Sequence, residues 1–343
     1  MNRIRFGQTD LTVSQLCLGT MSMGNPAWKG WVLDEAASVP LLRLALNRGI
    51  NFFDMADWYS LGRNEEVVGR NLLKMSSREK LVLATKVFYP MSDDPADRGL
   101  SRAHIAKSID RSLKRIGTDY VDLYVIHAFD EATPIEETME ALHATVRAGK
   151  VRYLGASTMY AWQFATMNHV ADKHGWTPFI NMQCQYNLLY REEEREMFPY
   201  CRDRQIALTT FSPLARGFLA RSPAAGGDAT RTSRTAHDVH QGMYGDEIDR
   251  EIARRVHDLA RRRGVSAAHI AMAWVSGNPN HNVPIVGAVK ASHIEVAIEA
   301  LAVQLTADER AFLEAPYRPR DEINDQNTRP PRPRALYRER APR

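Results

Sequence analysis

The sequence predicts an α/β protein whose strands close into a (β/α)8 barrel, also called a TIM barrel. Eight short apolar segments alternate with helical segments along a chain of 343 residues. The strand segments are nearly continuous apolar runs, which suits a parallel sheet buried on both faces. Barrels of this length form one domain. A doubly wound open sheet is the alternative, but no G-x-G-x-x-G motif follows an early strand.

The predicted elements follow one another in a regular order. Residues 3–18 are expected to form a hairpin and then the first barrel strand, and Asn51-Phe52-Phe53 the second. The other predicted strands are 81–86, 121–126, 151–156, 179–182, 206–210 and 283–286. The predicted helices are 36–48, 102–116, 134–148, 161–174, 192–204 and one starting at Ser292. Two extra helices, 247–263 and 306–314, stand outside the alternation.

The net charge of +4 arises in the C-terminal tail. Residues 317–343 carry eight Arg and four acidic residues, so the rest of the chain balances at 37 basic and 37 acidic residues. The basic pI therefore does not indicate a nucleic-acid-binding face. We expect residues 1–316 to form the barrel and the Pro- and Arg-rich tail, 317–343, to be extended.

Three cysteines, Cys17, Cys184 and Cys201, are too few and too widely spaced for a disulfide framework or a metal motif. They fit a reducing cytoplasm. The chain starts without an apolar signal segment and has no apolar run of about 18 residues, so we expect neither secretion nor a membrane span.

Polar residues gather where the predicted strands end. In such barrels the chemistry sits at the C-terminal ends of the strands. The candidates are Asp54, Lys86, His127, Ser157, Gln183, Phe211, Ser212 and Gly287. Taken alone, a strand-end Asp is more often a turn residue, and a strand-end Lys is more often a solvated charge.

Three of these positions form a coherent acid–base set once Tyr59 is added. A phenol ionises near pH 10, so it needs a neighbouring cation to give up a proton near neutrality. Lys86 is placed to be that cation, and Asp54 to hold Lys86 charged and oriented. His127 is placed to position a substrate oxygen. No metal site is expected.

The chain resembles the aldo-keto reductases over about residues 3–315. The motifs that carry the resemblance are LCLGTMSMG, NFFDMADWYSLGRNEEVVGR, ATKV, GTDYVDLYVIHAFDEATPIEETMEAL, RYLGAST, QCQYNLLYREEEREM, FSPLARGFL and PIVGAVKASHIEVAIEAL. It is most similar to the bacterial auxin-induced-protein-like oxidoreductases, a branch that includes the potassium-channel β subunits. The resemblance implies an NADPH-dependent reduction of an aldehyde or ketone.

The resemblance also assigns roles to residues. Tyr59 falls on the family's general acid, with Lys86, Asp54 and His127 as its partners. Ser157, Thr158 and Gln183 fall where the carboxamide of the cofactor is bound, and Phe211 where an aromatic ring stacks on the nicotinamide. The full expected cofactor set is Thr20, Met21, Asp54, Ser157, Thr158, Gln183, Phe211, Ser212, Leu214, Arg216, Gly217, Gly287, Lys290 and His293. Thr158, His293 and Ala297 depart from the usual family residues.

The phosphate site can also be argued from the residues. Loops after the last two strands commonly bind phosphate in these barrels. The first loop contains Arg216 and Gly217, and the second contains Lys290 ahead of a helix N-terminus, where we expect Ser292 and Glu295 to form a capping box. This arrangement favours NADPH over NADH.

Aromatic residues suggest the wall of a substrate pocket: Trp28, Trp31, Trp58, Tyr89 and Phe129. The loop 221–245 is either a lid or a surface excursion. We expect a small carbonyl compound as partner, no nucleic acid or membrane, and a monomer or weak homo-oligomer. A redox-sensing NADP-binding protein with weak turnover, and a lyase using Lys86 as a Schiff-base nucleophile, are the alternatives.

Overall fold

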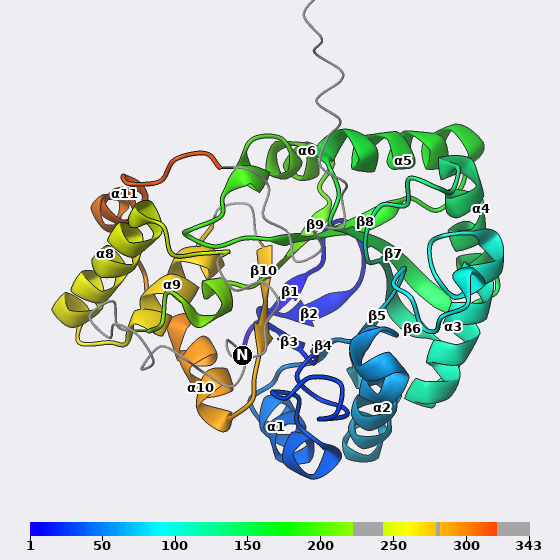
Figure 1. The fold of residues 1–343 in the computed structure, drawn as a ribbon, viewed down its shortest axis with the longest axis horizontal. Coiled ribbons are helices and arrows are strands. Elements are labelled where there is room, and N and C mark those ends of the chain that lie inside the picture. Colours follow the sequence, from blue (N-terminus) through cyan, green and yellow to red (C-terminus); the bar gives the residue numbers. More distant parts are fainter. Residues whose placement is uncertain (222–242, 279–281, 321–343) are drawn as a thin grey trace, which may run out of the picture.

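A closed barrel of eight parallel strands forms the centre of the molecule, as predicted (Figure 1). The computed structural model describes residues 1–221, 243–278 and 282–320, without the side chain of residue 282. Around the barrel the strand order is β10-β3-β4-β5-β6-β7-β8-β9. The strands are β3 (Cys17–Gly19), β4 (Phe52–Asp54), β5 (Val82–Val87), β6 (Val121–Ile126), β7 (Val151–Ser157), β8 (Phe179–Gln185), β9 (Ala207–Phe211) and β10 (Asn282–Gly287).

Ten helices in the described parts of the chain lie around the outside of the barrel (Figure 1). They are α1 (Glu35–Asn47), α2 (Arg63–Met75), α3 (Arg102–Ile116), α4 (Ile135–Arg147), α5 (Ala161–His174), α6 (Met197–Asp203), α8 (Glu247–Arg263), α9 (Ala267–Ser276), α10 (Ala291–Ala300) and α11 (Ala307–Glu314). The extra helices α8 and α11 lie where the sequence predicts them. None of the helices in the described parts is both long enough and apolar enough to cross a membrane.

Apolar packing explains why the helices attach where they do. In α3, Ile105, Ile109 and Leu113 are buried at helical spacing, and the helix ends at the left-handed Gly117. A large apolar cluster joins such helix faces to the outward-facing strand residues. A smaller cluster around Phe6 and Phe52 fills the end of the barrel interior that lies next to the N-terminal hairpin.

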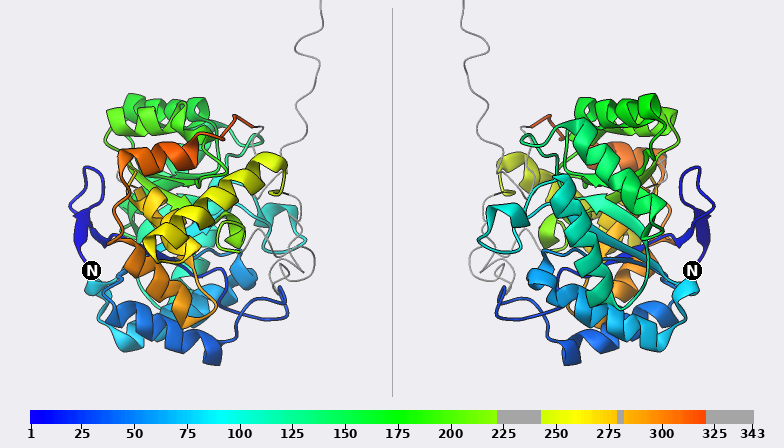
Figure 2. Two further views of the ribbon diagram at one scale, coloured as in Figure 1. Left: turned by 90° about the vertical axis from the view of Figure 1, so that its left-hand side faces the viewer. Right: turned by 90° about the vertical axis from the view of Figure 1, so that its right-hand side faces the viewer.

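The N-terminal hairpin closes one end of the barrel. Strands β1 (Arg3–Arg5) and β2 (Thr12–Ser14) pair antiparallel. Phe6, in the turn between them, packs edge-on against Phe52 of β4 at a ring distance of 5.5 Å. In Figure 2 this hairpin projects at one end of the barrel, and the loop after β3 projects at the other. The loop-bearing end is therefore the open mouth.

One helix prediction needs correction, and two helices were not predicted. The sequence predicts one helix over 192–204, but the chain forms a 3-10 turn, Glu192–Glu194, and then α6. Pro199 lies in the first turn of α6, where its missing N–H costs nothing, so the helix restarts shortly before it. Helix α9 was not predicted because it is buried on nearly every side and shows no clear amphipathic pattern. Helix α2 was also not predicted, and its inner face includes buried polar residues.

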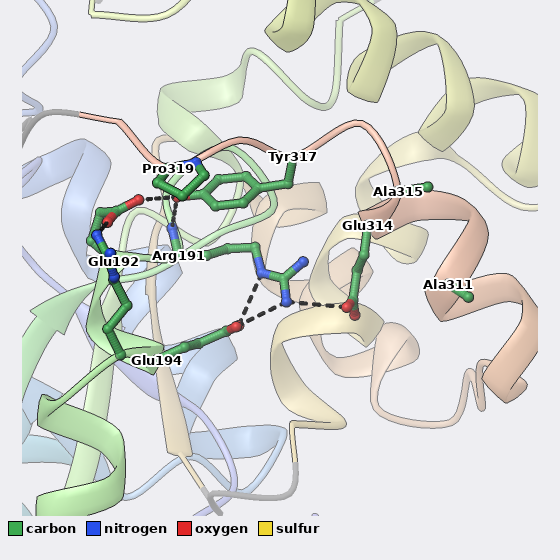
Figure 3. A pocket seen from close by; sticks show the side chains of 9 residues that line it. Arg191, Glu192, Glu194, Ala311, Glu314, Ala315, Tyr317 and Pro319 are labelled. Carbon is green, nitrogen blue, oxygen red and sulfur yellow. Dashed lines mark hydrogen bonds and ion pairs between the residues drawn. The ribbon is translucent and has the colours of Figure 1, made fainter.

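The first residues of the C-terminal tail are packed against the protein. The Tyr317 hydroxyl donates to Glu192 Oε1 at 2.6 Å and accepts from the backbone N–H of Arg191 at 3.0 Å. Arg320 donates to Asp249 Oδ1 at 3.0 Å. Figure 3 shows the cavity beside Tyr317, where Arg191 reaches the carboxylates of neighbouring segments. The expected extended segment from residue 321 onward, and most of the loop 221–245, lie outside the described residues.

Candidate active site

The register of the barrel brings the predicted strand-end residues to one mouth. Gly19 pairs with Asp54 between β3 and β4, and Ser157 pairs with Gln183 between β7 and β8. Lys86 lies opposite Val125, one residue short of the end of β6. Because all eight strands are parallel, their C-terminal ends meet at the same end of the barrel.

A buried lysine connects two of the predicted acid–base residues. Lys86 Nζ donates to Asp54 Oδ2 at 2.6 Å, to the Met55 carbonyl oxygen at 2.9 Å and to the Tyr59 hydroxyl oxygen at 3.1 Å. The Lys86 side chain has no exposed surface. Burial alone would lower its pKa, but Asp54 and Tyr59 outweigh burial, so the pKa of Lys86 is raised. The lysine therefore stays charged and faces the phenol.

Asp54 is held on both carboxylate oxygens. Its Oδ2 accepts from Lys86, and its Oδ1 accepts from Gln183 Nε2 at 3.0 Å. The backbone carbonyl of Asp54 accepts the Thr20 hydroxyl at 2.8 Å. Gln183 and Thr20 thus position the Asp54 carboxylate and its strand. Their expected contacts with a cofactor remain predictions.

His127 lies next to Tyr59 as a neutral imidazole. The two rings meet edge to face, with centroids 5.7 Å apart. Burial lowers the pKa of His127 well below its usual range, and the charge of Lys86 lowers it further. Its Nδ1 is buried without a hydrogen-bond partner in the described parts of the chain. A neutral imidazole can donate a hydrogen bond to a substrate oxygen without transferring its proton.

The predicted aromatic wall is partly assembled at this mouth. Tyr89 lies 4.9 Å from the His127 ring and 4.9 Å from Trp58, which in turn lies 5.1 Å from Trp28. The ammonium group of Lys29 sits over Trp28 at 4.5 Å and also approaches Trp58 and the buried Trp31. Phe129, in the loop after β6, instead packs near Trp162 at 6.3 Å.

The loop after β9 is a tight turn that contains left-handed residues. Ser212, Ala215, Arg216 and Gly217 all have positive φ angles. The N–H groups of Ala215 and Gly217 donate to carbonyl oxygens of the same loop, which holds the turn closed. Asn187 Nδ2 donates to the Ser212 carbonyl at 3.0 Å and fixes the start of this loop. Phe211 and Leu214 are half-buried beside it.

The loop after β10 leads into α10, but not as predicted. Lys290 itself is the N-cap residue, and its side chain makes no cap hydrogen bond. The predicted N-cap, Ser292, lies inside the helix, and Glu295 pairs with Arg48 at 3.4 Å instead of closing a capping box. An extended Lys290 backbone lets the helix begin two residues early, so the serine is not needed as a cap.

Other residues of the expected cofactor set lie around the same loops. His293 Nδ1 accepts from the Val289 N–H at 3.4 Å, and burial followed by the nearby Lys290 charge lowers the pKa of His293. Ser157 and Thr158 hydroxyl groups lie 3.1 Å apart at the end of β7. Gly287 is exposed at the end of β10, and Met21 is half-buried in the loop after β3.

Sequence reasoning overlooked two buried polar residues beneath the mouth. Asn64 donates to the Thr20 and Met23 carbonyls at 2.7 and 2.9 Å, which ties the loop after β3 to α2. Asp57 accepts from Ser108 at 2.7 Å. Both lie in the NFFDMADWYSLGRNEE motif, so the motif itself was the available signal.

The residues of the mouth fit a nicotinamide dinucleotide cofactor, which carries anionic phosphate groups. Arg216 and Lys290 offer positive charge, and the N-terminus of α10 adds its dipole. Among the described residues, no three His, Cys, Asp or Glu side chains are grouped so as to hold a metal ion.

Comparisons with known proteins agree with this geometry. The chain is 41% identical over 338 residues to a versiconal hemiacetal acetate reductase of Aspergillus parasiticus, which covers 93% of this chain and 98% of the relative. It is 41% identical over 341 residues to the aldo-keto reductase AMT2 of Alternaria alternata, which covers 92% of this chain and 91% of the relative. It is 38% identical over 339 residues to a putative aryl-alcohol dehydrogenase of Saccharomyces cerevisiae, which covers 93% and 98%.

These relatives are fungal, so they do not confirm the narrower expectation of a bacterial branch. They do agree with the pattern of the aldo/keto reductase family, which matches residues 15–317 and thus nearly the whole barrel. The chain belongs to the aldo/keto reductase family.

Proposed function

We propose that this protein reduces an aldehyde or ketone to an alcohol with NADPH, and that Tyr59 supplies the proton. The observation that carries the proposal is the contact between Lys86 Nζ and the Tyr59 oxygen at 3.1 Å, inside a buried ion pair with Asp54. A fixed ammonium group stabilises the phenolate that remains after proton transfer. Membership of the family supports carbonyl reduction in general.

Each residue of the site has a separate task in this reaction. When bound, NADPH supplies the hydride that reaches the carbonyl carbon. Tyr59 delivers a proton to the carbonyl oxygen, and Lys86 stabilises the resulting phenolate. His127, neutral and buried, donates a hydrogen bond that orients the same oxygen. Asp54 keeps Lys86 charged and in place.

The preference for NADPH rests on the cations at the mouth. NADPH differs from NADH by one ribose phosphate, so discrimination needs a positive charge near that group. Lys290 caps α10, where free backbone N–H groups also point outward. The lowered pKa of His293 leaves that side chain neutral near pH 7, so Lys290 is the better candidate.

The aromatic wall supports aromatic carbonyl compounds as substrates. Trp58 and Tyr89 extend the site outward from His127 in a continuous row of rings. Several relatives are named putative aryl-alcohol dehydrogenases, in agreement with such a wall. We further propose that the protein acts in the cytoplasm as a monomer or weak homo-oligomer. Three buried, unpaired cysteines support a reducing compartment.

The Schiff-base alternative is disfavoured by the hydrogen bonds of Lys86. An ammonium group has three N–H donors, and all three are directed at acceptors. A lysine nucleophile needs a free lone pair. Borohydride in the presence of an aldehyde is therefore expected to leave Lys86 unmodified, as peptide mass analysis would show.

The decisive test is turnover. Purified protein is mixed with NADPH and a panel of aromatic aldehydes, aliphatic aldehydes, ketones and sugars, and the oxidation of NADPH is followed by absorbance. We expect reduction of at least one aromatic aldehyde, with the alcohol identified as product. Binding of NADPH without oxidation for any member of the panel would instead favour the redox-sensing alternative.

A further inference from the structure

Tyr89 carries a buried hydroxyl group that forms no hydrogen bond with the described residues. The residue is 8% exposed, and its hydroxyl has no hydrogen-bond partner in residues 1–221, 243–278 and 282–320. Leaving a buried polar group unpaired costs about 1–3 kcal/mol. A phenylalanine would fill the same volume without that cost. A partner from outside these described residues, such as a bound substrate, would explain the hydroxyl.

The position of Tyr89 places this hydroxyl at the active site. Tyr89 follows Lys86 by three residues, just after β5. Its ring meets the His127 ring edge to face at 4.9 Å, and the His127 ring in turn meets that of Tyr59 at 5.7 Å. Trp58 covers another side of the Tyr89 ring at 4.9 Å. These neighbours fix the ring within the aromatic wall.

The hydroxyl can act only as a neutral group. Burial raises the pKa of Tyr89, and the nearby Tyr59 raises it further. Tyr89 therefore does not compete with Tyr59 as a proton source. A phenol that keeps its proton near neutrality is a hydrogen-bond donor, and it can also accept a hydrogen bond.

The carbonyl oxygen of the substrate already has two hydrogen-bond donors in the proposed mechanism. An sp² oxygen has two lone pairs, and Tyr59 and His127 are placed to occupy both. A third donor on an adjoining ring is then suited to a different oxygen of the same substrate. We propose that the Tyr89 hydroxyl binds a second oxygen of the substrate, so that the preferred substrates are aromatic aldehydes bearing a ring hydroxyl. This inference rests on the carbonyl reduction proposed above.

The experiment compares benzaldehyde with 2-, 3- and 4-hydroxybenzaldehyde, with NADPH, in the wild type and in Tyr89→Phe. The wild type is expected to prefer at least one hydroxy isomer. Tyr89→Phe should lower kcat/KM for that isomer about 5- to 100-fold, the value of one lost hydrogen bond with an unpaired substrate group. For benzaldehyde, the loss of kcat/KM should be at least about fivefold smaller than for that isomer, because benzaldehyde has no second oxygen for the Tyr89 hydroxyl to bind.

Tyr124→Phe is the matched control. It removes another buried hydroxyl, from β6, where Tyr124 belongs to the apolar cluster beneath the helices. The preference among the four aldehydes should be unchanged in Tyr124→Phe. The melting temperature of Tyr89→Phe should equal or exceed that of the wild type, because the lost hydroxyl has no partner among the described residues.

The outcomes separate the two proposals. Equal losses for benzaldehyde and its hydroxy isomers, or no loss for any of them, would overturn the role of Tyr89 and leave carbonyl reduction standing. A drop of several degrees in the melting temperature of Tyr89→Phe would show a structural role and also overturn the inference. A wild type that reduces no carbonyl compound at all would overturn the proposed function, and the inference with it.

Discussion

The two ends of the barrel make their tight turns with different residues. At the closed end, left-handed backbone falls on glycines that precede strands, such as Gly117, Gly149 and Gly175. At the mouth it falls on glycines such as Gly62 and also on residues with side chains, including Leu61, Thr158 and Arg216. Among the described non-glycine residues with φ near +50°, only Gln205 lies outside the mouth loops.

This difference shows where the fold stores strain. A residue with a Cβ in the left-handed region costs about 1–2 kcal/mol, whereas glycine does not pay that cost. Such strain persists where the surrounding structure holds it, commonly at functional sites. Apart from Gln205, the closed end avoids this strain by using glycine in its left-handed turns. The mouth keeps non-glycine residues in several of its left-handed turns. The following predictions test this contrast, starting with the largest expected effect.

Loss of the Tyr59 hydroxyl should greatly slow carbonyl reduction at the mouth. In Tyr59→Phe we expect kcat for carbonyl reduction to fall by about 10²- to 10⁴-fold, because general acid catalysis contributes that much. Affinity for NADPH, measured by quenching of protein fluorescence, should stay within a few-fold. In the proposed mechanism the phenol donates the proton but is not needed to hold the cofactor.

The matched control lies at the closed end. The Tyr153 hydroxyl is hydrogen-bonded to Asp10 of the hairpin, and Tyr153 pairs with Leu123, two residues nearer the closed end than Val125, the partner of Lys86. Tyr153→Phe should leave kcat unchanged. Activity of Tyr59→Phe within about tenfold of the wild type would show that another group is the acid.

Asp57 should make the unfolding free energy of the protein depend on pH. Burial raises its pKa to about 7, and the nearby Glu65 adds to that shift. The folded protein thus keeps this proton at a pH where the unfolded chain has lost it. Unfolding free energy from this group therefore falls as pH rises from about 4 to about 7, by as much as about 3–4 kcal/mol.

Asp57→Asn removes that dependence while keeping the shape and an acceptor for Ser108. Urea unfolding at pH 5, 6, 7 and 8 should show the variant gaining stability over the wild type as pH rises. Both proteins share all other titrating groups, so their difference isolates Asp57. A difference that stays constant across this pH range would mean that Asp57 is not titrating in the fold.

The sequence predicted the barrel because each strand is a short apolar run that ends in a recognisable polar residue. It also predicted the Asp54–Lys86–Tyr59 contacts, because parallel strands must end together. It overlooked α9, whose burial on nearly all sides removes the amphipathic signal. The buried Asp57 and the Lys290 cap depend on packing and on backbone angles, which no local pattern specifies.

Lys290 should govern the choice of cofactor. Lys290→Met is expected to weaken NADPH binding by about ten- to a hundredfold, the value of one charge-assisted contact, and to leave NADH nearly unaffected. Fluorescence quenching gives both dissociation constants. Lys173→Met, which removes an exposed lysine near the closed end of the barrel, is the control. If the binding of both cofactors weakens equally, Lys290 does not contact the ribose phosphate, and Arg216 becomes the next candidate.

The smallest effect tests the contrast most directly, through one residue from each end. Gly149 has φ +72° and precedes β7, and a Cβ added there would meet no atom within 4 Å. Leu61 has φ +50° and ψ +49°, follows Tyr59 by two residues, and is 55% exposed. Neither change therefore creates a clash or a large cavity, so backbone conformation decides the outcome.

Gly149→Ala should lower the unfolding free energy by about 1 kcal/mol and leave kcat unchanged, because it introduces left-handed strain far from the chemistry. Leu61→Gly should do the reverse. It relieves the same strain and raises the unfolding free energy by up to about 1 kcal/mol, after the added entropy of the unfolded chain is subtracted. It also loosens the turn that holds Tyr59 against Lys86, so kcat should fall several-fold. Urea unfolding and steady-state kinetics on both variants measure the two quantities. If Leu61→Gly is less stable than the wild type, or keeps full activity, then the left-handed turns at the mouth are not strain that the catalytic geometry requires.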